Sequence, residues 1–200
     1  MGKILILNGS PRISKSNSKR YAELFIQYCH KRCDYFSILQ SNHFQLRQKM
    51  EEYDDVLLVF PLYVDSLPVG LLAFLKYLEE NPPQNNPVIS ILINCGFLEY
   101  QQNEVAVAMI RLFCQQCGYT LGSVLMLGGG EAILGTPFKL WAVWSIRKLA
   151  RSVTNRNYRL FHTTMPLTKK LFLKASTRYW IKYGQKFGIT KEQMETMQIE

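Results

Sequence analysis

Short apolar runs alternate with segments of helical periodicity along the first 127 residues. Five runs are apolar enough to be strands buried on both faces, as parallel strands are. They are residues 3–7 (KILIL), 34–39 (DYFSIL), 55–60 (DVLLVF), 87–94 (PVISILIN) and 120–127 (TLGSVLML). The intervening segments predict helices, mostly with apolar residues on one side. These helices are expected over residues 17–31 and 41–52, from Pro68 onward, and over 99–117.

This alternation predicts an α/β fold, a doubly wound five-stranded parallel sheet covered by helices on both faces. In such sheets ligands bind at the carboxyl ends of the strands, where the strand order switches direction. We find no internal repeat and no low-complexity linker. We therefore expect residues 1–200 to form one domain, with a core over 1–135 and a C-terminal helical extension over 136–200.

Size and composition fit a folded soluble protein. The chain has 200 residues, of which 48% are hydrophobic and 20% charged. No apolar stretch is long enough to cross a bilayer, which takes about 18 residues. The first ten residues, MGKILILNGS, have too short an apolar run for a signal peptide and fit a first strand. A cytoplasmic protein is expected.

The net charge of +9 is concentrated in the last third of the chain. Residues 132–191 hold thirteen Lys or Arg and no Asp or Glu, which leaves eleven Lys and Arg against fifteen Asp and Glu elsewhere. Within 166–188, basic residues follow one another four apart and apolar residues lie beside them. The basic residues are Lys170, Lys174, Arg178, Lys182 and Lys186. Such a helix can lie on an anionic membrane, but we favour a terminal helix that packs on the domain, and no nucleic-acid motif accompanies the charge.

Five cysteines are spread over the chain, an odd number that argues against a disulfide framework. Cys114 and Cys117 form a C-x-x-C pair, so redox or zinc chemistry has to be weighed. The pair lies late in a predicted helix, no second C-x-x-C supports zinc, and we interpret these cysteines as buried structural thiols. Cys95 follows a predicted strand but has no evident activating His. The sequence predicts neither a metal site nor a catalytic cysteine.

The loop after the first predicted strand, NGSPRISKSNS, is rich in groups that bind anions. It offers Ser10, Arg12, Ser14, Ser16, Asn17 and Ser18 just before a helix. Hydroxyls and free backbone N–H groups at a helix N-terminus favour a phosphate. The loop lacks the second Gly and the Lys of an ATP-binding loop, which indicates a single terminal phosphate. The alternative is a simple helix cap, but a cap needs one such residue and not six.

Two further loops supply the surroundings of a planar group. PLYVDSLP, after the third strand, places Tyr63 between two prolines, where its ring can stack or merely cover the sheet end. NCGF, after the fourth strand, places Gly96 and Phe97 at the same edge, and GGGE follows the fifth strand. A phosphate site beside an aromatic wall predicts a phosphorylated planar ligand, of which FMN is the simplest.

The motifs ILNGSPRISKSNS, FPLYVDSLP and NCGFLEYQQ, with a helix ending FCQQCGY, resemble the flavodoxin-like NAD(P)H-dependent FMN reductases and quinone reductases. The resemblance covers about the first 135 residues, and the basic segment after residue 138 is longer than a minimal member needs. It implies that the FMN phosphate is held by Ser10, Arg12, Ser16, Asn17 and Ser18. It implies that the isoalloxazine is lined by Pro61, Leu62, Tyr63 and Val64, and closed on its other side by Asn94, Gly96 and Phe97. It also implies a homodimer.

The function that follows is an FMN-dependent oxidoreductase that passes electrons from NAD(P)H to a quinone, a flavin or a similar small acceptor. The flavin carries the chemistry, so no catalytic side chain is required. The alternatives are a non-catalytic FMN-binding electron carrier or regulatory flavoprotein, and an interaction module that has lost the flavin. Known flavodoxins are acidic, so the charge of +9 argues against the carrier.

Overall fold

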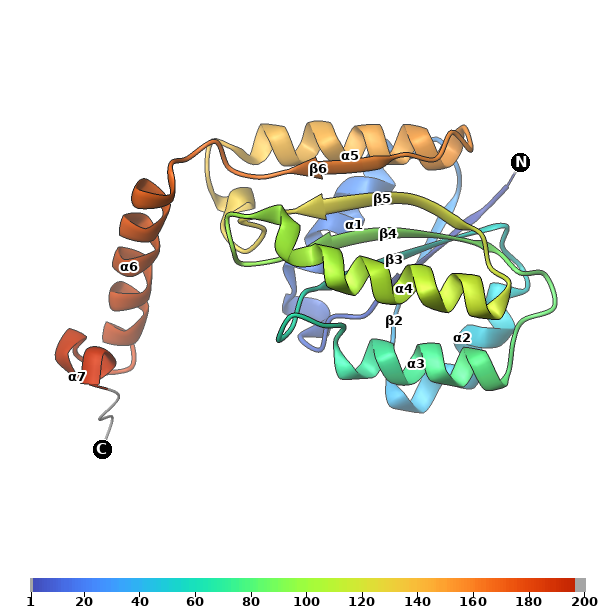
Figure 1. Ribbon diagram of the computed structural model, residues 1–200, viewed down its shortest axis with the longest axis horizontal. Coiled ribbons are helices and arrows are strands. Elements are labelled where there is room, and N and C mark those ends of the chain that lie inside the picture. Colours follow the sequence, from blue (N-terminus) through green and yellow to red (C-terminus); the bar gives the residue numbers. More distant parts are fainter. Residues whose placement is uncertain (1, 197–200) are drawn as a thin grey trace. The chain divides into compact units, whose positions relative to one another are not determined.

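A single parallel sheet organises most of the chain in the computed structural model, which describes residues 2–196 (Figure 1). The strand order is β2-β1-β3-β4-β5-β6, and every neighbouring pair is parallel. The strands are β1 Ile4–Asn8, β2 Cys33–Ser37, β3 Asp55–Pro61, β4 Val88–Asn94, β5 Leu121–Leu127 and β6 Leu160–Thr163. The chain moves from β1 to one side for β2 and to the other side for β3. The strand order therefore switches direction between β1 and β3.

Helices cover both faces of this sheet. On one face α1 (Asn17–Tyr28) packs beside α5 (Lys139–Thr154). On the other face lie α2 (His43–Met50), α3 (Val69–Glu80) and α4 (Glu104–Cys117). Short 3₁₀ turns, Ile13–Lys15, Gln40–Asn42, Tyr100–Asn103 and Ile133–Gly135, precede or follow these elements. The connections place the loops after β1, β3, β4 and β5 at one edge of the sheet.

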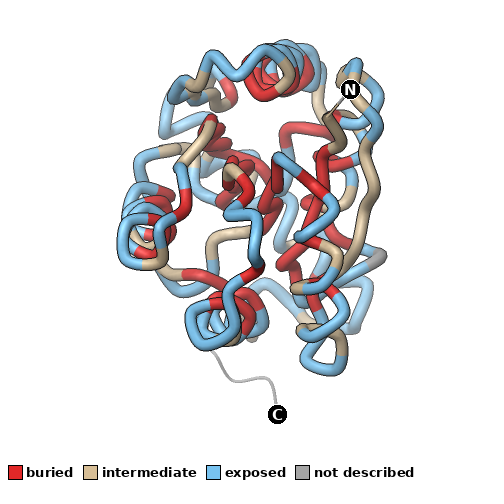
Figure 2. The backbone as a smooth tube through the Cα atoms, turned by 90° about the vertical axis from the view of Figure 1, so that its right-hand side faces the viewer, coloured by how far each residue is buried: buried red, intermediate tan, exposed pale blue. Residues whose placement is uncertain are grey.

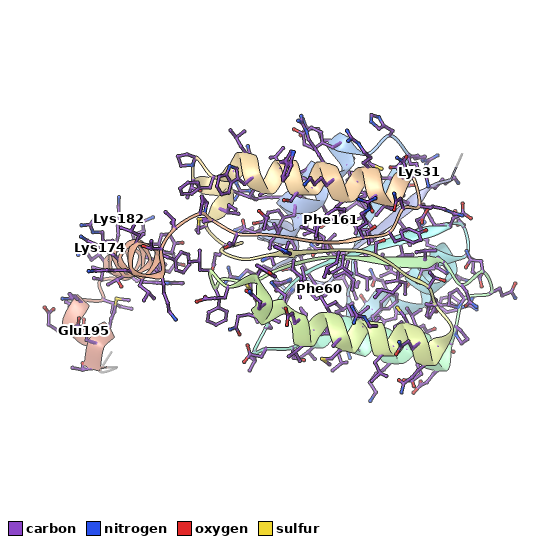
Figure 3. The ribbon with its side chains drawn as sticks, turned by 45° about the horizontal axis from the view of Figure 1, so that its top comes forward. Lys31, Phe60, Phe161, Lys174, Lys182 and Glu195 are labelled. Carbon is purple, nitrogen blue, oxygen red and sulfur yellow. The ribbon has the colours of Figure 1, made fainter. Side chains whose placement is uncertain are left out.

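The core lies on both faces of the sheet, under α1 and α5 on one side and under α2, α3 and α4 on the other. Buried residues are concentrated on the central strands and on the sides of the helices that face them (Figure 2). Phe60 of β3 is fully buried and belongs to one apolar cluster with Leu71 and Phe74 of α3 (Figure 3). β1 is buried along its whole length, as the continuous apolar run predicts. The register pairs Asn8 with Val59, so the loop after β1 lies beside the end of β3.

The prediction of five strands was wrong, because the sheet has six. β6 has four residues, alternates between exposed and half-buried positions, and pairs on one side only, with β5. An edge strand of this length has no continuous apolar run, so the pattern that identified the buried strands could not detect it. The segment 136–200, predicted as a helical extension, therefore includes a strand of the sheet.

The chain divides into two compact units, Met1–Met165 and Pro166–Glu200. The first holds the sheet together with α1–α5. The second holds α6 (Lys169–Gln185) and α7 (Lys191–Thr196). The basic segment 166–188 thus forms a helix as predicted, and Thr168 caps it by accepting a hydrogen bond from the backbone N–H of Leu171. Among the described residues, none of the helices has both the length and the apolar character to cross a membrane.

Candidate ligand-binding site

A pocket of about 160 Å³ opens at the carboxyl ends of β1, β3 and β4, where the strand order switches direction. Ten of the twelve residues predicted to bind the cofactor line it. They are Ser10, Arg12, Ser16, Asn17, Ser18, Pro61, Leu62, Tyr63, Asn94 and Gly96. The lining also includes Glu131, which the sequence interpretation left without a role, and does not include Val64 or Phe97. Loops that are far apart in the sequence therefore meet at one site.

The N-terminus of α1 forms the polar end of the pocket. The Ser16 hydroxyl caps the helix, because it accepts a hydrogen bond from the Lys19 N–H at 3.1 Å and donates to the Ile13 carbonyl at 2.8 Å. Helix geometry leaves the N–H groups of Asn17 and Ser18 without an acceptor inside the helix. These N–H groups and the positive end of the helix dipole suit an anion. Ser16 thus performs the capping role that the sequence analysis raised as the alternative.

Asn8, which ends β1, fixes the loop that leads into this helix. Its side chain is fully buried, accepts a hydrogen bond from the Ser10 N–H at 2.9 Å and donates to the Tyr35 hydroxyl at 2.8 Å. Gly9 passes so close to the next layer that a Cβ would lie 3.1 Å from Leu71 and 3.3 Å from Phe60. The sequence analysis placed this Gly in a ligand-binding loop. The structure shows that a larger residue here would also crowd Leu71 and Phe60.

Arg12 reaches a carboxylate across the pocket. Its Nη1 lies 3.6 Å from Oε1 of Glu131, and both side chains are about half exposed or more. A Cβ on Gly96 would lie 3.7 Å from Oε2 of the same carboxylate. Asn17 donates a hydrogen bond from Nδ2 to the Glu131 carbonyl at 3.0 Å. The only sequence signal for Glu131 was its place in GGGE, directly after the fifth predicted strand.

Tyr63 stands at the end of a tight turn beside the pocket. Tyr63 and Ser66 exchange two backbone hydrogen bonds, of 3.1 and 2.8 Å. The two residues between them, Val64 and Asp65, have φ of 47° and 53°. This left-handed region is unusual for any residue but Gly and is especially unfavourable for β-branched Val. The Val64 side chain is 96% exposed, so it gains no apolar burial that would offset the cost of its positive φ.

The loops after β4 and β5 are hydrogen-bonded to each other. The Gly130 N–H donates to the Cys95 carbonyl at 2.7 Å, and the Gly129 N–H donates to the Phe97 carbonyl. A Cβ on Gly130 would come within 2.7 Å of the Cβ of Asn94, so only Gly permits this approach. Phe97 extends out from the joined loops, is 54% exposed and does not line the pocket. Its predicted contact with a ligand remains a prediction.

Comparisons with known proteins agree with this architecture. No family model matches the chain, and no curated protein matches it by sequence. Among solved structures, a Streptococcus pneumonia flavodoxin has a TM-score of 0.57 and 12% identity, and covers 76% of this chain and 98% of its own. The chain has the flavodoxin fold.

Two enzymes share this flavodoxin fold. An FMN-dependent NADH-azoreductase from Bacillus anthracis, solved with FMN, has a TM-score of 0.60 and 11% identity, and covers 76% of this chain and 100% of its own. An NAD(P)H:quinone oxidoreductase from Methanothermobacter marburgensis has a TM-score of 0.58 and 13% identity, and covers 79% and 98%. At identities this low, the structural likeness establishes the fold and nothing more.

Within the flavodoxin fold, the thiols that the sequence singled out are poorly suited to nucleophilic chemistry. Cys95 is buried, and burial raises its pKa although the Asn103 amide hydrogen-bonds its sulfur. Burial also raises the pKa of Cys114 to about 12 and that of Cys117 above its usual value, but Cys117 is only partly buried, so the prediction of two buried thiols is right for Cys114 alone. Within residues 2–196, no group of three or more His, Cys, Asp or Glu side chains could hold a metal ion.

Proposed function

We propose that this protein is an FMN-dependent oxidoreductase that passes electrons from NAD(P)H to a quinone, a flavin or a similar small acceptor. The observation that carries the proposal is the pocket at the switch between β1 and β3, where the N-terminus of α1 meets Ser10 and Arg12. An anion-binding helix end at this position suits a ligand with one terminal phosphate.

The residues present fit the phosphate of FMN. The N–H groups of Asn17 and Ser18 and the Ser10 hydroxyl supply hydrogen bonds, and Arg12 supplies the positive charge. The Ser18 hydroxyl donates to Oδ1 of Asn94 at 3.2 Å, so its role is to hold the helix end against β4. Glu131 competes with the phosphate for Arg12, and we infer that the two carboxylate oxygens move away when an anion binds.

The open side of the pocket fits a planar ring. Pro61, Leu62 and Tyr63 form one wall, and Tyr63 is 36% exposed, which leaves a flat face available for stacking. Asn94 and Gly96 line the pocket beside them, since the Leu62 N–H donates to the Asn94 carbonyl at 2.8 Å. When bound, FMN accepts a hydride and passes electrons onward. The protein residues orient the ring and exclude water from the covered side.

The assignment of NAD(P)H as electron donor is supported by the names of two proteins of the same fold. These are the FMN-dependent NADH-azoreductase and the NAD(P)H:quinone oxidoreductase. The pocket is also compatible with this donor, because hydride transfer to a flavin requires no acid or base from the protein. The buried Tyr21 hydroxyl near the site donates to the Gly130 carbonyl, and burial raises its pKa, so it acts as a structural donor.

The decisive experiment is anaerobic reduction of the reconstituted protein. The purified protein is incubated with FMN, freed of excess flavin, and titrated with NADPH and with NADH while the absorbance near 450 nm is followed. Bleaching by either nucleotide, followed by recovery on addition of a quinone, supports the enzyme. Retention of FMN without reduction by either nucleotide indicates the electron carrier instead. Failure to retain FMN overturns both assignments.

A further inference from the structure

Helix α6 carries two chemically different faces. Basic side chains occur at every fourth position along one of them, and Lys174 and Lys182 extend outward from the helix (Figure 3). The basic face consists of Lys170, Lys174, Arg178, Lys182 and Lys186. The aromatic face consists of Phe172, Tyr179, Trp180, Tyr183 and Phe187, and it borders the C-terminal part of the basic face.

The aromatic face is a continuous surface. Its four C-terminal rings contact one another, with centroids 5.3 Å apart for Tyr179 and Trp180 and 5.2 Å apart for Tyr183 and Phe187. The side chains of Tyr179, Trp180, Tyr183 and Phe187 are between 43% and 66% exposed. Tyr and Trp combine an apolar ring with a polar group, which suits a boundary between water and an apolar phase.

The unit that holds this helix cannot bury the aromatic face internally. Gly184 is the only residue of α6 that is buried, and Met194 of α7 packs on it, where a Cβ would lie 2.8 Å from the Met194 sulfur. A helix and one further short helix bury too little apolar surface to offset the entropy of folding. The aromatic face therefore needs an additional surface for its stability.

The charge of this unit indicates which kind of surface α6 can bind. Residues 166–196 contain seven Lys or Arg and two Glu. Such a helix attracts an anionic surface and repels another copy of its own basic face. In single-stranded nucleic-acid sites, stacking aromatics and cations share one groove. Here the rings of Tyr179, Tyr183 and Phe187 pack on one another and form one apolar surface, which favours a lipid interface over separate stacking sites for bases.

We propose that α6 binds the surface of a bilayer that contains anionic lipids. The aromatic face inserts at the level of the headgroups, with Trp180 and Tyr183 at its centre. The long Lys and Arg side chains extend around the helix toward the lipid phosphates. Binding of this kind is reversible and sensitive to salt. It does not depend on whether the protein binds FMN.

Co-sedimentation of the full chain with vesicles tests the proposal. We expect binding to phosphatidylcholine vesicles that contain about 30% phosphatidylserine at low salt, at least tenfold weaker binding to phosphatidylcholine alone, and loss of binding at about 0.5 M salt. The double variant Lys174→Glu, Lys182→Glu should bind at least tenfold more weakly. The control Lys76→Glu, Arg111→Glu changes the net charge equally at exposed positions of α3 and α4 and should bind normally.

A second measurement reports on the aromatic face. In the background Trp141→Phe, Trp144→Phe, the remaining tryptophan is Trp180, and its emission should shift to shorter wavelength with anionic vesicles only. Far-UV circular dichroism of each variant establishes that it has folded. The proposal is overturned if the anionic vesicles bring down no protein at low salt. It is also overturned if the Lys174→Glu, Lys182→Glu variant binds like the control, or if Trp180 emission is unchanged while protein sediments.

Discussion

The Arg12 guanidinium and the Glu131 carboxylate face each other across the candidate pocket, with Nη1 and Oε1 3.6 Å apart. The two residues come from the loops after β1 and β5, on either side of the switch in strand order. Exposed pairs of this kind contribute little to stability, typically below about 1 kcal/mol. The pair matters because the cation best placed to bind a phosphate already has an anionic partner.

Glu131→Gln should strengthen FMN binding. The substitution removes the charge that competes for Arg12 and repels a phosphate, so we expect affinity to rise about fivefold, corresponding to roughly 1 kcal/mol. Quenching of flavin fluorescence measures it. Riboflavin, which has no phosphate, should show no gain, and Glu23→Gln, outside the pocket, should leave both affinities unchanged. An equal gain for FMN and riboflavin would mean that Glu131 acts on the ring and not on the phosphate.

Arg12→Ala combined with Ser10→Ala should have the opposite effect. Loss of the charge and one hydroxyl should weaken FMN about 30-fold, because hydrogen bonds to charged groups contribute about 1.5–3 kcal/mol. Riboflavin affinity should fall less than threefold. Lys19→Ala serves as the control, since Lys19 pairs with Glu23 and does not line the pocket. Comparable losses for both flavins would contradict a phosphate site at this end.

Val64→Asn should stabilise the protein. Val64 has φ of 47°, a conformation that Asn tolerates better, so the free energy of unfolding should rise by about 1 kcal/mol. Urea denaturation measures it. Val69→Asn, at an exposed position of α3, should produce no such gain. If the exposed Val64 side chain contacts the flavin ring, FMN affinity falls in the same variant, and an unchanged affinity would remove Val64 from the site.

Cys29 should be the most reactive thiol at neutral pH. The neighbouring Cys33 thiol, with smaller contributions from Lys31 and Thr154, lowers the pKa of Cys29 to about 6. Because the thiolate forms above this pKa, alkylation of Cys29 by iodoacetamide should stop increasing above about pH 7, where ordinary thiols still gain reactivity. Peptide mapping by mass spectrometry follows each cysteine.

Removal of the neighbouring thiol provides the control for Cys29. Cys33→Ala eliminates the largest cause of the lowered pKa, so alkylation of Cys29 at pH 7 should slow and should keep rising toward pH 9. Cys114, whose pKa burial raises to about 12, should react slowly in both proteins. A profile for Cys29 that is identical with and without Cys33 would contradict this effect of the Cys33 thiol.

The sequence predicts the central sheet well because burial on both faces leaves a continuous apolar run, as in Ile4–Leu7. β6 lacks that signal. At the site, the carboxyl-edge rule correctly brought together Ser10, Tyr63 and Asn94. The sequence did not identify Glu131 as a site residue, because its partner Arg12 is remote in the sequence and a single carboxylate after three glycines follows no periodic pattern. The strained φ of Val64 is equally invisible, since nothing in PLYVDSLP resembles a turn that favours positive φ.

Backbone hydrogen bonds join residues 95–97 to residues 129–130, so the loops after β4 and β5 move as one rigid segment. Because Gly130 touches Asn94 so closely, any side chain added there would displace the wall that contains Gly96. A change of ligand specificity is therefore difficult to obtain by altering either loop alone. The turn Tyr63–Ser66 is closed by two backbone hydrogen bonds of its own and joins α4 through the Ser66 hydroxyl and the Met109 sulfur, so substitutions at its exposed tip leave the two joined loops undisturbed.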